Sequence, residues 1–162
     1  MKYFTRDLID RMHDDNLPLL AWTNVVRQYR NRCRKLLHIL PANVRRLTTT
    51  SFHDCKVQSI SFSKRNRLDI VLYGHRYYRY SKRSIPGVHH LIFTGVTNAI
   101  ITFTTLNDWW LYEEVDITKG SPEYRVILDR TEIWIRFERF RLETNTQHSS
   151  AGDAANRAAG AK

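Results

Sequence analysis

The chain has 162 residues, 42% of them hydrophobic and 12% aromatic, and a formal net charge of +10 at pH 7. These values are typical of one folded domain with a single hydrophobic core and argue against a disordered protein. No run approaches the roughly 20 apolar residues of a transmembrane helix. Charged residues also interrupt the N-terminal segment where a signal peptide would be apolar. We therefore expect a cytoplasmic protein with no membrane partner.

The positive charge is concentrated in one block of the sequence. Between Arg27 and His90 there are fifteen Lys and Arg against two acids, a net charge of +13, whereas residues 1–26 carry −1 and residues 91–162 carry −2. Charge that is segregated in this way favours a surface of one sign. We expect that surface to contact a partner of opposite charge.

The first 41 residues are expected to be helical. Thr5 is a typical N-cap for a short helix over about residues 6–13, and Pro18 suits the first turn of a second helix that ends before Pro41. In the second helix, apolar residues recur every three or four positions, which predicts one buried stripe and one basic side. The stripe comprises Trp22, Val26, Tyr29, Cys33, Leu36, Leu37 and Leu40.

From about residue 52 the apolar pattern changes to the alternation typical of β-strands. Strands are predicted over residues 56–62 and 68–73, joined by a polar hairpin turn. Residues 74–90 are interpreted as a long loop or an irregular edge, because Gly74, Pro86 and Gly87 interrupt the pattern.

Five further strands complete the predicted sheet. In the last of them, over residues 132–142, the apolar side chains lie on one strand face at Ile133 and on the opposite face at Phe140. This change predicts a β-bulge near Glu138. The five strands are predicted over residues 90–96, 99–104, 110–117, 123–128 and 132–142.

Short strands joined by short turns favour an antiparallel meander over parallel βαβ units. The predicted fold is a single α+β domain over residues 1–143, in which two N-terminal helices (1–41) pack on a largely antiparallel sheet of six to seven strands (52–143). From residue 144 the chain is polar and small, which predicts a disordered tail over 144–162.

Six short segments occur in an order found in a known family. They are Met1–Thr5, Leu40-Pro41, His53–Val57, Leu91–Val96, Trp110–Val115 and Arg125–Leu128. Together they resemble a bacterial family that is known only as a domain of unknown function, over about residues 1–143. The resemblance supplies no catalytic residues. Some similar small α+β proteins are encoded beside secreted toxins, which implies an immunity-like role.

The segment from Tyr73 to Arg83 alternates aromatic and basic residues. Such side chains can stack on bases and neutralise phosphates, but no RNP-type strand, helix-turn-helix or zinc spacing accompanies them. Aromatic and basic loops also serve protein interfaces. The candidate basic surface consists of three pieces, the outer side of a helix, a hairpin turn and this segment, which form one face only if the fold brings them to the same side. Its residues are Arg27, Arg30, Arg34, Lys35, Lys64, Arg65, Arg67, Arg76, Tyr77, Tyr78, Arg79, Tyr80, Lys82 and Arg83.

Glu113 is the most unusual residue of the predicted sheet, because it shares a strand face with apolar residues such as Val115. A buried carboxylate is costly unless it is paired. Arg125, Arg136 and His53 are the candidate partners. We favour a structural ion pair over a catalytic acid, because no nucleophile or base accompanies Glu113. Glu113 and His53 together are the candidate buried polar site.

The other histidines and the cysteines are interpreted as structural. His53 and Asp54 adjoin at the start of a strand, where neighbouring side chains are expected to point to opposite faces, which argues against an acid–base pair. His89-His90 lacks a third ligand at metal spacing. Cys33 and Cys55 are expected to be reduced and buried. No metal site, cofactor or catalytic residue is assigned.

The sequence therefore predicts a non-enzymatic bacterial protein-binding module that presents its basic surface to an acidic protein. The alternative is nucleic-acid binding by residues 73–83 and the basic side of the helix over residues 20–40. A hydrolase is the third hypothesis, and a deep pocket around Glu113 would favour it.

Overall fold

The computed structural model describes residues 1–14, 18–63, 65–102 and 107–146. Its helices are α1 (Arg6–His13), α2 (Leu19–Ile39) and α3 (Arg46–Thr49). Thr5 caps α1 as predicted, since its hydroxyl accepts a hydrogen bond from the backbone N–H of Leu8 at 3.3 Å. The four-residue α3 was not predicted, because one turn is too short to show a helical period. None of the described helices is long and apolar enough to cross a membrane.

An antiparallel sheet follows the helices, so the α+β class is confirmed. Within the described residues the sheet has nine strands, more than the six to seven predicted, in the order β5-β8-β7-β6-β2-β3-β4-β9 with β1 paired to β3. The strands are β1 (Thr50–Ser51), β2 (Cys55–Ser63), β3 (Arg67–Tyr78), β4 (Ser84–Thr94), β5 (Asn98–Ile101), β6 (Trp109–Thr118), β7 (Ser121–Leu128), β8 (Glu132–Arg136) and β9 (Arg139–Asn145).

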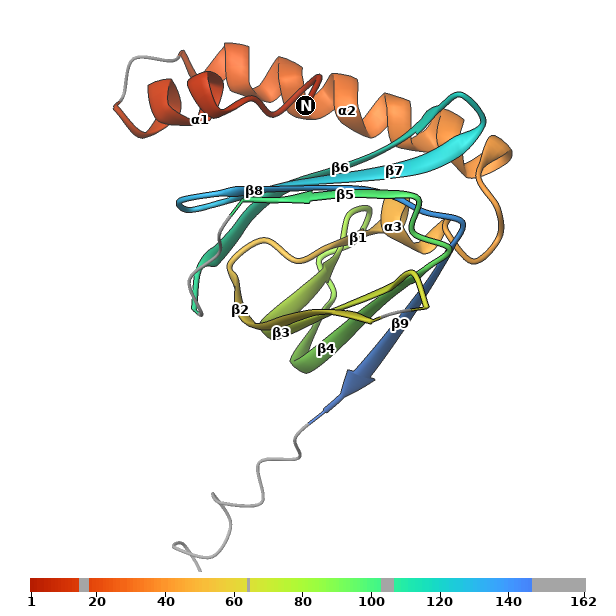
Figure 1. Cartoon of the computed structure of the whole chain (residues 1–162). Helices are drawn as coiled ribbons and strands as arrows, with labels where there is room; N and C mark the ends of the chain where they lie inside the picture. Colours follow the sequence, from red (N-terminus) through yellow and green to blue (C-terminus); the bar gives the residue numbers. More distant parts are fainter. Residues whose placement is uncertain (15–17, 64, 103–106, 147–162) are drawn as a thin grey trace, which may run out of the picture.

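The sheet folds over into two layers. As Figure 1 shows, β5 to β8 lie in one layer and β2, β3, β4 and β9 in the other, and α2 covers the outer face of the first layer. The layers share a narrow backbone connection, because β2 and β6 pair only at Cys55↔Trp110 and Lys56↔Trp109. Beyond these pairs β6 separates from β2 and β3.

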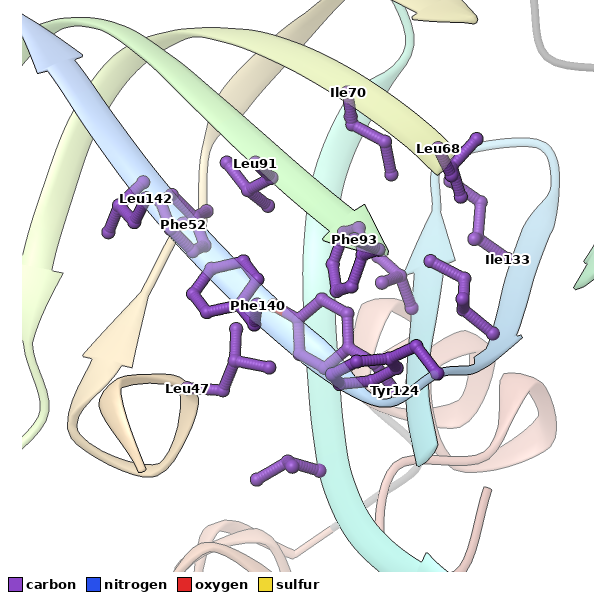
Figure 2. Packing of buried hydrophobic residues seen from close by; sticks show 14 of the residues in the cluster. Leu47, Phe52, Leu68, Ile70, Leu91, Phe93, Tyr124, Ile133, Phe140 and Leu142 are labelled. Carbon is purple, nitrogen blue, oxygen red and sulfur yellow. The ribbon is translucent and has the colours of Figure 1, made fainter. Parts of the chain in front are cut away.

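The main core fills the space between the layers. Figure 2 shows Phe93 and Phe140 of one layer beside Tyr124 and Ile133 of the other. A second cluster lies between α2 and the outer face of the first layer. Its buried members are Phe4, Ile9, Tyr29, Cys33 and Ile127. The predicted stripe of α2 is divided between the two clusters, because Leu36 and Leu40 belong to the main core.

The predicted long loop over residues 74–90 is wrong, because β3 continues to Tyr78 and β4 begins at Ser84. Gly74 and Gly87 are directly opposed in the ladder, with φ of +148° and +144°. Other residues rarely adopt this backbone conformation, and a Cβ on Gly87 would lie 2.5 Å from the carbonyl oxygen of Asn145. Here glycine permits close packing of strands and does not mark a loop.

The predicted bulge near Glu138 is instead the point where the chain crosses from one layer to the other. β8 ends at Arg136 and β9 begins at Arg139. Between them, the N–H of Phe137 bonds to one layer at Pro122 and the N–H of Glu138 bonds to the other at Thr94. The predicted tail overlaps the end of β9 at residues 144–145, and residues 147–162 lie outside the described part of the chain, as do residues 103–104 of a predicted strand.

Candidate functional site

A cavity of about 370 Å³ is lined by residues of α2, of β6 and of the end of β3. Its walls are largely aromatic and come from four parts of the chain: the N-terminal segment, α2, the end of β3, and β6. Exposed or half-buried polar side chains surround the opening, and the buried Arg79 and Glu113 lie deepest. The aromatic wall consists of Phe4, Tyr29, Tyr77, Tyr78 and Tyr112, and the polar rim consists of Arg30, Ser51, His53, Asp54 and Ser81.

Glu113 faces the interior as predicted, and its side chain is only 1% exposed. A register shift between Trp110 and Tyr112 precedes it in the ladder with β7. Its carboxylate is fully engaged: Trp110 Nε1 donates a hydrogen bond to Oε2 at 2.7 Å, and Arg79 Nη2 donates to Oε1.

The partners expected for Glu113 were wrong. Arg125 and Arg136 both pair with Glu123, at 2.9 Å and 2.6 Å. His53 lines the same cavity as Glu113 but makes its own contacts at the rim. The true partner, Arg79, follows β3 in a segment that the sequence had assigned to a loop, so its direction was not predictable from strand alternation.

Arg79 is held in place from three sides. Its backbone N–H donates to Thr49 O at 2.9 Å, and its guanidinium lies 5.2 Å from the centre of the Tyr29 ring. Burial lowers the pKa of Arg79, but Glu113, Tyr29, Cys33 and Tyr124 together raise it by more, so the pKa lies above its ordinary value. Burial also raises the pKa of Tyr29, whose hydroxyl oxygen accepts a hydrogen bond from Val115 N at 2.9 Å. The bottom of the cavity is therefore a fixed ion pair.

His53 and Asp54 form a contact at the rim, contrary to the expectation that they point apart. His53 Nε2 lies 3.5 Å from Asp54 Oδ1. The two residues occupy a turn in which Asp54 has a φ of +65°, so strand alternation does not apply. The other ring nitrogen of His53, Nδ1, contacts the carbonyl oxygen of Leu111. Both ring nitrogens thus face oxygen acceptors.

The basic side of α2 meets the segment after β3 next to the cavity. Arg34 of α2 lies 5.8 Å from the centre of the Tyr80 ring, and Arg30 shares the cavity rim with Ser81. We call this surface the arginine–tyrosine face. It comprises Arg27, Arg30, Arg34, Lys35, Tyr77, Tyr80, Lys82 and Arg83, all of them exposed.

The cations of the arginine–tyrosine face are not neutralised by neighbouring acids. None of its Arg and Lys side chains forms a salt bridge with a residue in the described part of the chain. Arg27 and Arg34 instead donate hydrogen bonds to the neutral side chains of Asn24 and Asn31. The face is therefore an exposed surface of positive charge.

The predicted basic surface is divided by the fold. Arg67 begins β3 and Arg65 lies just before it, whereas Tyr77 is ten residues further along the strand, roughly 33 Å from Arg67. Arg67 is paired with Asp69 at 2.7 Å, and Lys64 lies outside the described residues. Two further predicted surface cations, Arg76 and Arg79, are buried or nearly so.

His89 and the two cysteines are buried. His89 is buried between Gly74 O at 3.2 Å and Thr144 Oγ1 at 3.1 Å, and burial lowers its pKa to about 4. Cys33 and Cys55 are free and buried, and burial raises the pKa of Cys55 to about 12. Over the described ranges, no group of three or more His, Cys, Asp or Glu is placed to hold a metal ion.

Comparison with the curated proteins finds no match. A family profile described as "Protein of unknown function (DUF4085)" matches residues 20–134, a range that runs from α2 into β8. This range includes the arginine–tyrosine face and all of the cavity lining except Phe4. Because the match spans most of the sequence, the chain belongs to the DUF4085 family.

Proposed function

We propose that the protein is a non-enzymatic binding module that holds an acidic protein on the arginine–tyrosine face. The observation that supports this most is the contact of Arg34 with Tyr80, at 5.8 Å, which joins the basic side of α2 to the segment after β3. Tyrosine and arginine side chains carry much of the binding energy in protein interfaces. Cations without local acids also attract an acidic partner over a distance.

The hydrogen bonds of the Glu113 carboxylate argue for a binding role over hydrolysis, although Glu113 lines a cavity. Both carboxylate oxygens are engaged, one by Arg79 and one by Trp110. A general acid or base must reach a proton on the substrate, and a fixed ion pair leaves neither oxygen free for that task. The cavity is better suited to receive a side chain of the partner.

Nucleic acid is the second candidate, because Tyr77 and Tyr80 are exposed beside the cations and could stack on bases. Asp54 weighs against it, since this carboxylate is 64% exposed at the cavity rim and would repel phosphates. In the immunity-like role that the family resemblance implies, the acidic partner in the bacterial cytoplasm would be a toxin.

A matched pair of charge-reversal variants tests the proposal. Arg30→Glu/Arg34→Glu alters the arginine–tyrosine face, and Arg65→Glu/Arg139→Glu alters exposed arginines at the other end of the sheet. Fluorescence anisotropy measures binding of labelled poly-L-glutamate and of an oligothymidine of equal charge, at low and at physiological salt. We expect the first variant to lose at least about tenfold in poly-glutamate affinity and the second to change little.

Two results would overturn the proposal. Equal losses in both double variants would mean that binding follows net charge and not the face. Tighter binding of the oligothymidine, with a steep salt dependence, would favour nucleic acid instead. An acidic protein that copurifies from the native host and is released by salt would then identify the partner.

A further inference from the structure

Arg76 is a cation enclosed by the protein without a counter-ion. It lies on the inner face of β3 and is only 3% exposed. Neither Nε nor Nη1 has a hydrogen-bond acceptor among the described residues, and Nη2 reaches only the Tyr78 hydroxyl, at 3.5 Å. No described carboxylate lies within salt-bridge distance of it.

The surroundings of Arg76 are also positive. The guanidinium groups of Arg76 and Arg83 lie 5.2 Å and 5.7 Å from the centre of the same Tyr78 ring. Burial lowers the pKa of Arg76, and the charges of Arg46 and Arg83 lower it further. Arg46, on α3, uses Nη1 to donate to Leu142 O at 3.3 Å. Three arginines therefore share one region without an acid.

A second unpartnered group lies in the same region. The hydroxyl of Thr50 is buried and has no hydrogen-bond partner among the described residues. Thr50 is directly opposite Tyr78 in the pairing of β1 with β3. A buried charge is expensive when nothing compensates it, and the face of one tyrosine ring compensates only in part.

We propose that Arg76 and Arg83, which both contact the Tyr78 ring, form a binding site for a phosphate group together with the neighbouring Arg46. Guanidinium donors match the geometry of phosphate oxygens, and a dianion balances clustered arginines better than a single carboxylate does. The Thr50 hydroxyl supplies a further hydrogen-bond donor. This site goes beyond acidic-protein binding and overlaps the arginine–tyrosine face at Arg83 only.

Thermal unfolding and calorimetry with sodium phosphate test the site, against sodium chloride at equal ionic strength and pH 7.5. Phosphate at ten times its dissociation constant is expected to raise the Tm of the wild type by about 3–6 °C. Arg76→Met should lose this response. The control Arg65→Gln, which also removes one positive charge, should keep it. If Arg76→Met does not fold, the exposed Arg83→Gln serves instead, with an expected affinity loss of about tenfold.

Two further comparisons distinguish free from esterified phosphate, and the phosphate site from the arginine–tyrosine face. AMP and a phosphoserine peptide in the same assay show whether the site prefers free or esterified phosphate, and either preference supports the site if it depends on Arg76. Arg30→Glu/Arg34→Glu should retain the phosphate response even where it loses poly-glutamate. Equal effects of phosphate and chloride, or an unchanged phosphate response in Arg76→Met and Arg83→Gln, would overturn the proposal.

Discussion

At the scale of single residues, the ion pair between Arg79 and Glu113 joins the end of β3 to β6 at the bottom of the cavity. Both residues are largely or fully buried, so each charge depends on the other for compensation. Replacing one partner of such a pair leaves an uncompensated charge in the protein interior.

Glu113→Gln should therefore lower the free energy of unfolding by about 3 kcal/mol. The glutamine still accepts the hydrogen bond from Trp110, but the charge of Arg79 is left unpaired. Urea unfolding followed by tryptophan fluorescence measures the change. Glu143→Gln is the control, because Glu143 is exposed and pairs with Arg141 at the surface. Equal stability of the two variants would contradict the structural role of the buried pair.

His89 makes stability depend on pH. Burial lowers its pKa from 6.5 to about 4, so between these values the unfolded chain binds a proton that the folded protein excludes. Above pH 6.5 both states are neutral and no stability is lost. We expect stability to fall as the pH drops from 6.5 to 4, with up to about 3 kcal/mol due to His89.

Urea unfolding at a series of pH values checks this contribution of His89. His89→Gln should show a shallower fall than the wild type over the same range. His38→Gln, at an exposed position on α2, should follow the wild type. Parallel curves for all three proteins would show that other groups cause the acid sensitivity.

At this scale, the sequence predicted which way Glu113 faces but not its partner. Strand alternation placed Glu113 with Val115, and that inference required only residues close in the chain. Arg79 comes from a segment whose glycines and proline obscured the strand pattern. The contact between His53 and Asp54 was also missed, because it depends on the positive φ of Asp54, which periodicity does not reveal.

At the scale of elements, one carboxylate binds the backbone of the N-terminal segment, and Arg6 adds hydrogen bonds to the turn between β7 and β8. Glu114 accepts hydrogen bonds from the backbone N–H groups of Lys2 at 2.9 Å and of Tyr3 and Phe4 at 2.6 Å each. This places Phe4 against Tyr29 and Tyr112, where it forms part of the cavity wall.

Glu114→Ala should release the N-terminal segment from β6. Hydrogen bonds to a charged acceptor contribute about 1.5–3 kcal/mol each, and the freed N–H groups regain bonds to water only if the segment detaches. Hydrogen exchange at residues 2–4 should then accelerate at least tenfold. Glu132→Ala, at an exposed position on β8, is the control. Unchanged protection of residues 2–4 would mean that apolar packing and the hydrogen bonds of Arg6 hold the segment without Glu114.

The elements themselves were predictable to different degrees. The stripe of α2 was predicted because a helical period repeats over five turns and reports burial directly. The length of β3 and β4 was not, because Gly74, Pro86 and Gly87 resemble loop residues in sequence. Pro86 is tolerated because it lies beyond the last pair of β4 with β9, Val88↔Asn145.

At the scale of the whole molecule, the fold determines which charges act together. The sequence left open whether the basic side of the helix, the hairpin turn and the aromatic-rich segment form one face, and the long β3–β4 hairpin places the last two at opposite ends. The sheet order that causes this depends on distant pairings such as β2 with β6, which local patterns do not encode. The α+β class was predictable because it follows from local periodicity alone.

Phe93 tests whether the two layers form one cooperative unit. It lies 5.7 Å from Tyr124 of the first layer and 5.1 Å from Phe140 of the second, measured between ring centres, and it is fully buried. Phe93→Ala should therefore lower the free energy of unfolding by about 3–5 kcal/mol. Because one core serves both layers, urea transitions followed by tryptophan fluorescence and by far-UV circular dichroism should remain coincident. Phe62→Ala, at a position 57% exposed, should have little effect. Separate transitions for the two probes would show that the narrow connection between β2 and β6 lets the layers unfold independently.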